Sequence, residues 1–550
     1  MAITISGGIT FSGGLSMALP AAEAAAAEAD TINAWDLDYA QPESNTSNLW
    51  DVTTAKFQQY FSTQSDIGGT GGPRGMHIGD SGAKLYAAPN GVDKIFEWDL
   101  TKPYDVSSAS FVHSFNVNSY QTNNRAVTFK PDGTKFYTVG FSGDTADQYD
   151  LSDAWNVASA SHVTDFSVAS QEANPEAIEF KPDGTKMFIL GSSGDDINEY
   201  TLSTAWDLST ATYSQASGST GSFESSPDGM HFKPDGTKVW IVGASTDSVD
   251  EYDLSTPWDV STLSHAGKDI SIGLNPESIW FKPDGSAFYA VQNTWSVYQW
   301  IVGQKQFLLR SDESTPNTVF FKTDGTKMYI CGQNGDEINE YDLSTAWDVE
   351  TATHNQNFSL ATQDSSPMSM YIKSDGTKFY MSGTSGDDIN EYDFGTAWDV
   401  STLSYSQNFS VSAKETNPEG LDFKPDGTKM YICGNGSDNV HEYDLSTAWD
   451  ISTASFNQSF AVNTEIVNPT EIRFESNGDK MFVVGRGTNL NDAIYEYALS
   501  TSWDISTASY SKKLNVPENT PTGLFFKPDG EKMYLVGSAE DTVFQYEFTS

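Results

Sequence analysis

The amino-acid sequence predicts an all-β protein built as a β-propeller, because one phrase of strand and turn residues recurs ten times. The clearest copy, F-K-P-D-G-T-K-M-Y-I-C-G, spans residues 423–434 and is followed by N-V-H-E-Y-D-L-S-T-A-W-D. The turn glycines recur every 49 to 52 residues, except for one interval of 40. They are Gly82, Gly133, Gly184, Gly236, Gly285, Gly325, Gly376, Gly427, Gly478 and Gly530. A period near 50 residues with a turn in every unit is typical of propellers and other repeat arrays.

Each unit contains the signals of four short antiparallel strands. In one unit, residues 177–180 alternate between apolar and polar side chains, as a half-buried strand does. The P-D-G turn at 182–184 combines a fixed φ with a glycine that accepts positive φ, which favours a tight hairpin. Residues 186–190 and 197–200 continue the pattern, and a fourth strand follows the W-D loop. Four strands repeated radially form a propeller blade; a superhelical array of β-units is the alternative.

The ten units divide into two sets of five, which predicts two tandem five-bladed propellers over residues 49–302 and 303–550. After Gly285 the W-D segment is missing, and the next turn glycine follows 40 residues later. We expect residues 50–61 to close the first propeller and residues 305–309 the second, since closure removes exposed sheet edges. A single ten-bladed ring is the alternative, although propellers usually have four to eight blades.

The composition argues against several classes of partner. The 550 residues include 30 basic and 75 acidic side chains, for a net charge of −45. Such a surface repels phosphate backbones and anionic lipids, so we expect no nucleic-acid partner and no membrane insertion. The first residues lack the pattern of a signal peptide. Cys331 and Cys433 hold the same repeat position, where other units carry mostly Val or Leu, which predicts buried thiols and no disulfide.

Residues that recur in nearly every unit are expected to serve the scaffold. In full units a Trp follows the turn glycine by 22 residues, and we expect its ring to pack between neighbouring blades. An Asp follows the turn glycine by 11 residues in eight units. Calcium loops need several oxygen ligands at alternating positions, so we interpret this Asp as a turn residue and expect no metal site; calcium binding by doublets such as Asp195-Asp196 and Asp387-Asp388 is the alternative.

Charged residues that vary between units are the candidates for a ligand site. Eight residues before the turn glycine, at the entry to the innermost strand, the first five units carry charged side chains. The second five units are mostly neutral there. The charged residues are Arg74, Arg125, Glu176, Asp228 and Glu277. At the mouth of a central channel they would form a mixed ring suited to a polar or zwitterionic ligand; a solvated rim of paired charges is the alternative.

Trp295 is a further candidate ligand-binding residue. It lies in a turn where most other units have small or polar residues. An exposed Trp there would stack against a sugar. Packing beside Trp280 and Trp300, in the unit that lacks the W-D segment, is the alternative.

No motif in the sequence indicates catalysis. The seven histidines are scattered without metal-ligand spacing, and neither a G-x-S-x-G elbow nor a phosphate-binding glycine loop occurs. We therefore expect no enzyme and no cofactor, with a hydrolase assembled from the many carboxylates as the alternative.

Residues 1–48 differ from the repeats. They contain short Ser-Gly-Gly stretches, an Ala-rich helical segment after Pro20 and a polar linker. A small segment of this kind beside large rigid rings is expected to be an arm that anchors the protein in an assembly; a disordered tail is the alternative.

The repeat phrase, F-K-P-D-G-T-K-M-Y … E-Y-D-L-S-T-A-W-D-I-S-T-A, resembles propeller-repeat proteins encoded by marine bacteria and their tailed phages. The resemblance covers roughly residues 49–550. The opening, M-A-I-T-I-S-G-G-I-T-F-S-G-G, is similar to the start of marine phage structural proteins. Together they imply a virion protein of tail-fibre, tail-tip or decoration type, assembled in the host cytoplasm.

The resemblance also implies partners for each part of the chain. Residues 1–48 would bind other virion proteins, and the propellers would adhere to a host cell-surface glycan or protein. A homo-oligomer is compatible with such a role. The alternatives are a purely architectural decoration or spacer protein without a ligand, and a secreted or surface-bound bacterial glycan-binding protein.

Overall fold

The computed structural model describes residues 35, 40–42, 49, 52, 56–68, 71–141, 143–273, 275–292, 295–309, 313–486, 492–516, 520–539 and 541–548. Over these ranges the protein is all-β, with ten antiparallel sheets and one single-turn helix, α1 (Gln64–Ile67). None of the helices in these ranges is long and apolar enough to cross a membrane. Most of the predicted arm, residues 1–48, lies outside the described residues, and so does Trp50.

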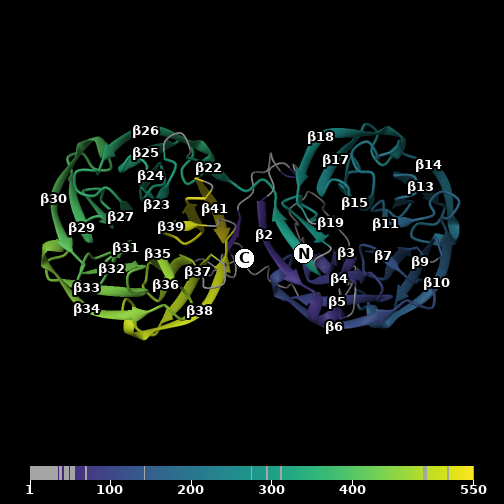
Figure 1. Cartoon of the computed structure of the whole chain (residues 1–550), viewed down its shortest axis with the longest axis horizontal. Helices are drawn as coiled ribbons and strands as arrows, with labels where there is room; N and C mark the ends of the chain where they lie inside the picture. Colours follow the sequence, from purple (N-terminus) through teal and green to yellow (C-terminus); the bar gives the residue numbers. More distant parts are fainter. Residues whose placement is uncertain are drawn as a thin grey trace, which may run out of the picture.

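The first propeller consists of blades 1 to 5, each a four-stranded sheet (Figure 1). Its strands, from the centre of the propeller outward, are β3 (Pro73–Gly79), β4 (Lys84–Pro89), β5 (Lys94–Leu100) and β6 (Ala109–Asn116) in blade 1; β7 (Asn124–Phe129), β8 (Lys135–Gly140), β9 (Thr145–Leu151) and β10 (Ala160–Ser167) in blade 2; β11 (Pro175–Phe180), β12 (Lys186–Gly191), β13 (Asp196–Leu202) and β14 (Ala211–Ala216) in blade 3; β15 (Pro227–Phe232), β16 (Lys238–Gly243), β17 (Ser248–Leu254) and β18 (Leu263–Ser271) in blade 4; and β19 (Pro276–Phe281), β20 (Ala287–Gln292), β21 (Ser296–Ile301) and β2 (Lys56–Ser62) in blade 5.

The second propeller consists of blades 6 to 10 and has the same strand order. Its strands are β23 (Pro316–Phe321), β24 (Lys327–Gly332), β25 (Glu337–Leu343) and β26 (Ala352–Ser359) in blade 6; β27 (Pro367–Ile372), β28 (Lys378–Gly383), β29 (Asp388–Phe394) and β30 (Leu403–Ser410) in blade 7; β31 (Pro418–Phe423), β32 (Lys429–Gly434), β33 (Asn439–Leu445) and β34 (Ala454–Ala461) in blade 8; β35 (Asn468–Phe474), β36 (Lys480–Arg486), β37 (Ala493–Leu499) and β38 (Ala508–Asn515) in blade 9; and β39 (Pro521–Phe526), β40 (Lys532–Gly537) and β41 (Thr542–Phe548) in blade 10, where β1 (Ala40–Pro42) and β22 (Gln306–Leu308) both pair with β41.

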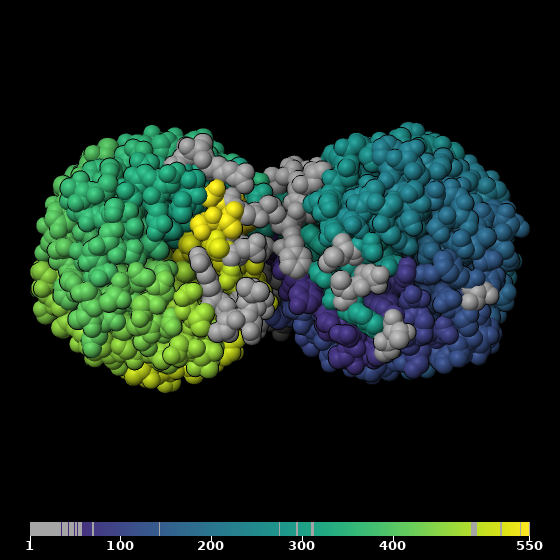
Figure 2. Space-filling view, viewed as in Figure 1, coloured from purple at the N-terminus to yellow at the C-terminus, as the bar shows by residue number. Residues whose placement is uncertain are grey.

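The innermost strands form two closed circles, which confirms the predicted arrangement of five plus five blades. β3 contacts both β7 and β19, so blade 5 neighbours blade 1. In the same way β23 contacts both β27 and β39, so blade 10 neighbours blade 6. Figure 2 shows the sequence colours running round each propeller in order, as expected when successive blades are neighbours.

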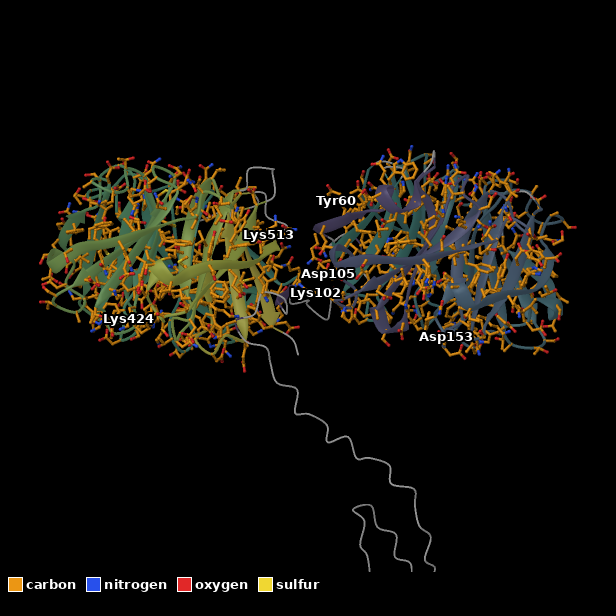
Figure 3. The ribbon with its side chains drawn as sticks, turned by 90° about the horizontal axis from the view of Figure 1, so that it is seen from below. Tyr60, Lys102, Asp105, Asp153, Lys424 and Lys513 are labelled. Carbon is orange, nitrogen blue, oxygen red and sulfur yellow. The ribbon has the colours of Figure 1, made fainter. Side chains whose placement is uncertain are left out.

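Segments from elsewhere in the chain complete the last blade of each propeller. Strand β2 pairs with β21 in blade 5, with Tyr60 opposite Tyr298, and Tyr60 is 57% exposed on the outer surface (Figure 3). In blade 10, β22 pairs with one half of β41 and β1 with the other half. Trp35 packs over Gly530 of blade 10, the position that the W-D tryptophan occupies in the other blades. The N-terminal A-W-D-L, residues 34–37, is therefore a further copy of the repeat motif.

The W-D loop forms the contact between neighbouring blades, as predicted for its Trp. In blade 3, Trp206 lies over the turn glycine Gly184, and its carbonyl accepts a hydrogen bond of 2.7 Å from the Tyr137 hydroxyl of blade 2. The carboxylate of Asp207 caps a short 3₁₀ helix, Leu208–Thr210, by accepting from the Ser209 N–H. Equivalent 3₁₀ helices follow the third strand at Val106–Ser108, Val157–Ser159, Val260–Thr262, Val349–Thr351, Val400–Thr402, Ile451–Thr453 and Ile505–Thr507.

Two further scaffold predictions are confirmed. The recurrent Asp between the second and third strands has a positive φ, between 46° and 55° in seven blades, which suits a short polar side chain in a turn. Both cysteines are buried and free, and burial raises the pKa of their thiols.

We predict that Gly184→Ala will destabilise the first propeller by about 3 kcal/mol or more, because two costs combine. Gly184 has φ +73°, where a Cβ is strained, and a Cβ would lie 2.2 Å from Nε1 of Trp206. Urea-induced unfolding followed by tryptophan fluorescence measures the loss.

Gly91→Ala is the matched control, because Gly91 has φ +70° in the same propeller and a Cβ at this position would have no heavy atom within 4 Å. It should cost only the backbone strain, about 1 kcal/mol. If both variants lost the same free energy of unfolding, the contact assigned between Gly184 and Trp206 would be contradicted.

Candidate functional site

Every innermost strand of the first propeller contains a β-bulge at its second residue. In β3 the register shifts between Pro73 and Gly75, and the same shift occurs in β7, β11, β15 and β19. A bulge leaves one residue out of the ladder and re-aims its side chain. The five bulged residues are Arg74, Arg125, Glu176, Asp228 and Glu277, which we call the charged ring.

Small residues beside the bulges bring the five strands close together. A Cβ on Gly75 would lie 2.4 Å from the Cα of Ala126 in the next blade. A Cβ on Gly229 would lie 2.6 Å from the Cα of Ser278. The channel is therefore narrow at this level, and the side chains of the charged ring converge just above it.

The charged ring is linked by ion pairs between blades. Arg74 contacts Glu277 of the adjacent blade 5 and lies 3.6 Å from Asp228 of blade 4. Arg125 lies 3.5 Å from Glu176 of blade 3. The structure thus brings together all five charged residues that the sequence predicted at this mouth. They are more buried than a solvated rim would be, with Glu176 only 6% and Arg125 9% exposed.

Burial shifts the ionisation of the ring toward neutral forms. It raises the pKa of Glu176 to about 8, that of Glu277 to about 7 and that of Asp228 to about 6, against the opposing effect of the two arginines. Burial also lowers the pKa of Arg125. Near neutral pH the carboxyl groups can therefore gain or lose protons as the charge of a bound group requires.

Arg125 has hydrogen-bonding capacity that the described protein atoms do not use. Its guanidinium carbon lies 3.8 Å from the centre of the Phe141 ring, which holds the group in place. Its Nη1 is buried and has no hydrogen-bond partner among the described residues, and its Nε faces Glu176 at 3.5 Å without forming a hydrogen bond. Buried donors without partners are costly, so this guanidinium is a favourable contact for an anionic group.

The equivalent mouth of the second propeller is linked by neutral hydrogen bonds. The Asn317 side chain donates to the carbonyl of Pro367 at 2.8 Å, and the Thr522 hydroxyl donates to the carbonyl of Pro316 at 2.9 Å. Thr470 donates in the same way to Pro521 at 3.1 Å. Each bond joins one blade to the next, so these side chains hold the second mouth together.

A buried ion pair, which the sequence analysis missed, fills the channel of the second propeller. Glu471 accepts hydrogen bonds from Thr318 and Ser369 at 3.0 Å and contacts Arg473 at 3.1 Å. Arg473 also donates to the carbonyl of Leu524 at 2.8 Å. A sequence signal was present, because every other unit has Gly, Ala, Ser or Thr at the position of Glu471.

A cavity of about 240 Å³ lies at the opposite end of the second channel. It is lined mainly by aromatic side chains, among them Phe320, Tyr371 and Phe525. Its carboxylate is already engaged, because Asp422 accepts from the N–H groups of Phe423 and Phe474 at 2.9 Å.

Trp295 lies in the turn before β21 and is half-buried. Its ring packs against the hydrophobic cluster of blades 1 and 5, as the packing alternative expects. Its carbonyl accepts from the backbone N–H of Thr63 at 2.8 Å, which connects the turn to the end of β2. These contacts give Trp295 a role in joining β2 to blade 5.

We predict that Glu176→Gln will change how stability depends on pH. Because the folded chain holds the Glu176 proton more tightly than the unfolded chain, raising the pH from 5 to 8 should weaken the wild type progressively. Gln does not titrate, so the variant should lose less stability than the wild type as the pH rises. The unfolding temperature of the variant should therefore increase relative to that of the wild type by several degrees between pH 5 and pH 8.5. Thermal unfolding followed by circular dichroism measures it.

Thr522→Val, at the equivalent position of the second propeller, is the control and should follow the wild-type pH profile. If the unfolding temperatures of Glu176→Gln and the wild type change with pH in parallel, the pKa of Glu176 is not raised in the folded chain.

No protein-family model and no curated protein matches this chain. Among solved structures, it is similar to a "putative 6-phosphogluconolactonase" from Bacteroides fragilis NCTC 9343, with 12% identity, a TM-score of 0.25, and coverage of 71% of this chain and 94% of that one. It is also similar to a protein from Lactobacillus plantarum, with 12% identity, a TM-score of 0.27, and coverage of 68% and 93%. At these TM-scores the likeness carries no argument about activity.

Proposed function

We propose that this chain is a non-catalytic recognition protein whose first propeller binds a small polar ligand at the charged ring. The observation that carries the proposal is the contrast between the two mouths. At this bulged position the first propeller has five charged side chains of both signs, among them Arg125 with an Nη1 that makes no hydrogen bond to the described residues. The second propeller has one buried carboxylate there, Glu419, and its other bulged residues are neutral, with Asn317 and Thr522 linking neighbouring blades.

The ligand that suits the charged ring carries both an acidic and a basic or hydroxyl group. An anionic group would contact the guanidinium of Arg125, and an ammonium or hydroxyl group would contact Glu277 and Asp228. Because the pKa values of these carboxyls lie near neutrality, a cationic group would stabilise their ionised forms. Amino sugars with acidic substituents and zwitterionic headgroups belong to this chemical class.

For the biological setting we propose a phage virion protein of tail-fibre, tail-tip or decoration type that meets the host surface. This part rests on the resemblance of the repeat phrase and of the opening residues to marine phage proteins. Trp35 and Ala40–Pro42 belong to blade 10, so the residues before Trp35 are the part of the predicted arm that would bind other virion proteins. The second propeller has a mouth where hydrogen bonds from Asn317 and Thr470 link neighbouring blades and a channel filled by Glu471 and Arg473, so it is suited to an architectural role as a spacer.

We predict that the labelled full-length chain will bind saturably to marine bacterial cells or to particular sugars on a glycan array, and that Arg125→Gln will weaken this binding at least tenfold. The loss of a charge-assisted hydrogen bond costs about 1.5–3 kcal/mol, which corresponds to that factor. Met368→Ala, at the equivalent position of the second propeller, should bind like the wild type.

Circular dichroism of each variant separates loss of binding from loss of fold. Undiminished binding by folded Arg125→Gln would exclude the charged ring as the site. If the folded wild type binds no cell and no glycan, the purely architectural alternative replaces recognition.

A further inference from the structure

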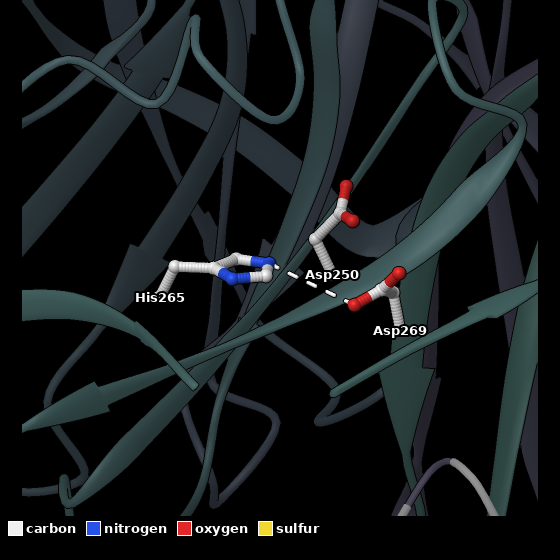
Figure 4. Close-up of side chains that lie close together, drawn as sticks. All are labelled: Asp250, His265 and Asp269. Carbon is white, nitrogen blue, oxygen red and sulfur yellow. Dashed lines mark ion pairs between the residues drawn. The ribbon is translucent and has the colours of Figure 1, made fainter. Parts of the chain in front are cut away.

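Three metal-ligating side chains meet on the outer half of blade 4 (Figure 4). Asp250 on β17 lies directly opposite Asp269 on β18, and His265 is opposite Tyr252. One ligand atom from each of Asp250, His265 and Asp269 lies within 4.8 Å of the other two. A bulge containing Gly267, at φ +71°, places His265 only two β17 residues from the Asp250–Asp269 pair and on the same face of the sheet.

Two of the three side chains have buried polar atoms without partners. Asp250 is only 4% exposed; its Oδ1 accepts from the Ser248 hydroxyl at 3.1 Å, but its Oδ2 has no hydrogen-bond partner among the described residues. Nε2 of His265 is likewise buried without a hydrogen bond, 4.0 Å from Oδ1 of Asp269. Phe223 stacks on the imidazole at 3.6 Å between ring centres and fixes its orientation.

The propeller scaffold accepts charged or neutral side chains at these positions, because blade 2 has Asp147 opposite Asp165 beside His162 whereas blade 6 is neutral. In blade 6 the corresponding cross-strand pair is Asn339 and Asn357, beside His354. There the imidazole Nε2 and the amide oxygen of Asn339 are 3.2 Å apart, so the polar atoms pair without an ion. Two carboxylates directly opposite each other repel, and the buried Glu224 adds a third negative charge near Asp250. A bound cation would remove this repulsion.

We propose that Asp250, His265 and Asp269 bind a divalent first-row transition-metal cation such as Zn²⁺. An imidazole with two carboxylates suits these cations, whereas Mg²⁺ and Ca²⁺ prefer oxygen ligands alone. The side chain of Asp269 is 56% exposed, which provides a route of entry and leaves a further coordination position open to water. The cation would tie the outer strand β18 to β17.

Binding requires two small changes in the site. Ligands of a tetrahedral zinc ion lie roughly 3.4 Å from one another, so the exposed Asp269 must move inward. Nδ1 of His265 accepts from the N–H of Gly267 at 3.2 Å, so the proton of the neutral ring lies on Nε2. Coordination through Nε2 moves that proton to Nδ1, and the exposed Gly267 N–H then turns to solvent.

The test measures zinc bound to the chelator-treated full-length chain by isothermal titration calorimetry and by metal analysis after dialysis. We predict that Asp250→Asn/Asp269→Asn and His265→Gln will each lose one equivalent of zinc relative to the wild type. The double variant should fold, because blade 6 pairs two asparagines at the equivalent position of the third strand and opposite it. His354→Gln removes the corresponding histidine of blade 6 and should keep the wild-type stoichiometry.

Thermal unfolding gives a second readout, since a cation that binds only the folded chain raises the unfolding midpoint. Zinc should raise the midpoint of the wild type and of His354→Gln by more than that of the double variant. The proposal is overturned if the wild type binds no zinc, or if the folded double variant binds the same number of equivalents with the same affinity.

Discussion

The contact between neighbouring blades is the interaction on which the rest of the structure depends. In seven blades a tyrosine hydroxyl on the second strand donates to the carbonyl of the W-D aromatic residue in the next blade, as Tyr329 does to Trp398 at 2.7 Å. A carboxylate on the third strand adds a second link, because Glu340 accepts from the N–H of Val400 at 3.1 Å. The repeated phrase thus encodes the joint between blades as well as the strands, which explains why it recurs almost unchanged.

The same joint explains how each propeller closes after five blades. The hydroxyl of Tyr289 in blade 5 donates to the carbonyl of Tyr104 in blade 1, and that of Tyr534 in blade 10 to Trp347 in blade 6. Blade 5 therefore finds its partner 185 residues earlier in the chain. The period, the turns and the five-plus-five division could be predicted from the sequence because each depends on local spacing. The role of Trp35 could not, since a single A-W-D-L does not show which blade it completes.

The candidate site was only partly predictable. The bulge lies at a fixed distance from the turn glycine in every unit, so the sequence identified the charged ring. Its burial depends on how closely five strands approach, which the sequence does not show. Glu471 carried a signal as the one large residue at its position. The grouping of Asp250 with His265 and Asp269 depends on strand register around a bulge, which no spacing rule supplies.

Because the blades are nearly identical, a residue that differs from those at the equivalent position in other blades can be compared with them directly. Where the scaffold needs only a polar link, the second propeller uses amides and hydroxyls, as at Asn317 and Thr522. Buried charges at the same positions raise the free energy of the folded chain unless something neutralises them. The first propeller carries such charges at the charged ring and again at Asp250. Under the two proposals made above, a ligand at the charged ring and a cation at Asp250 would neutralise these charges on the same physical grounds.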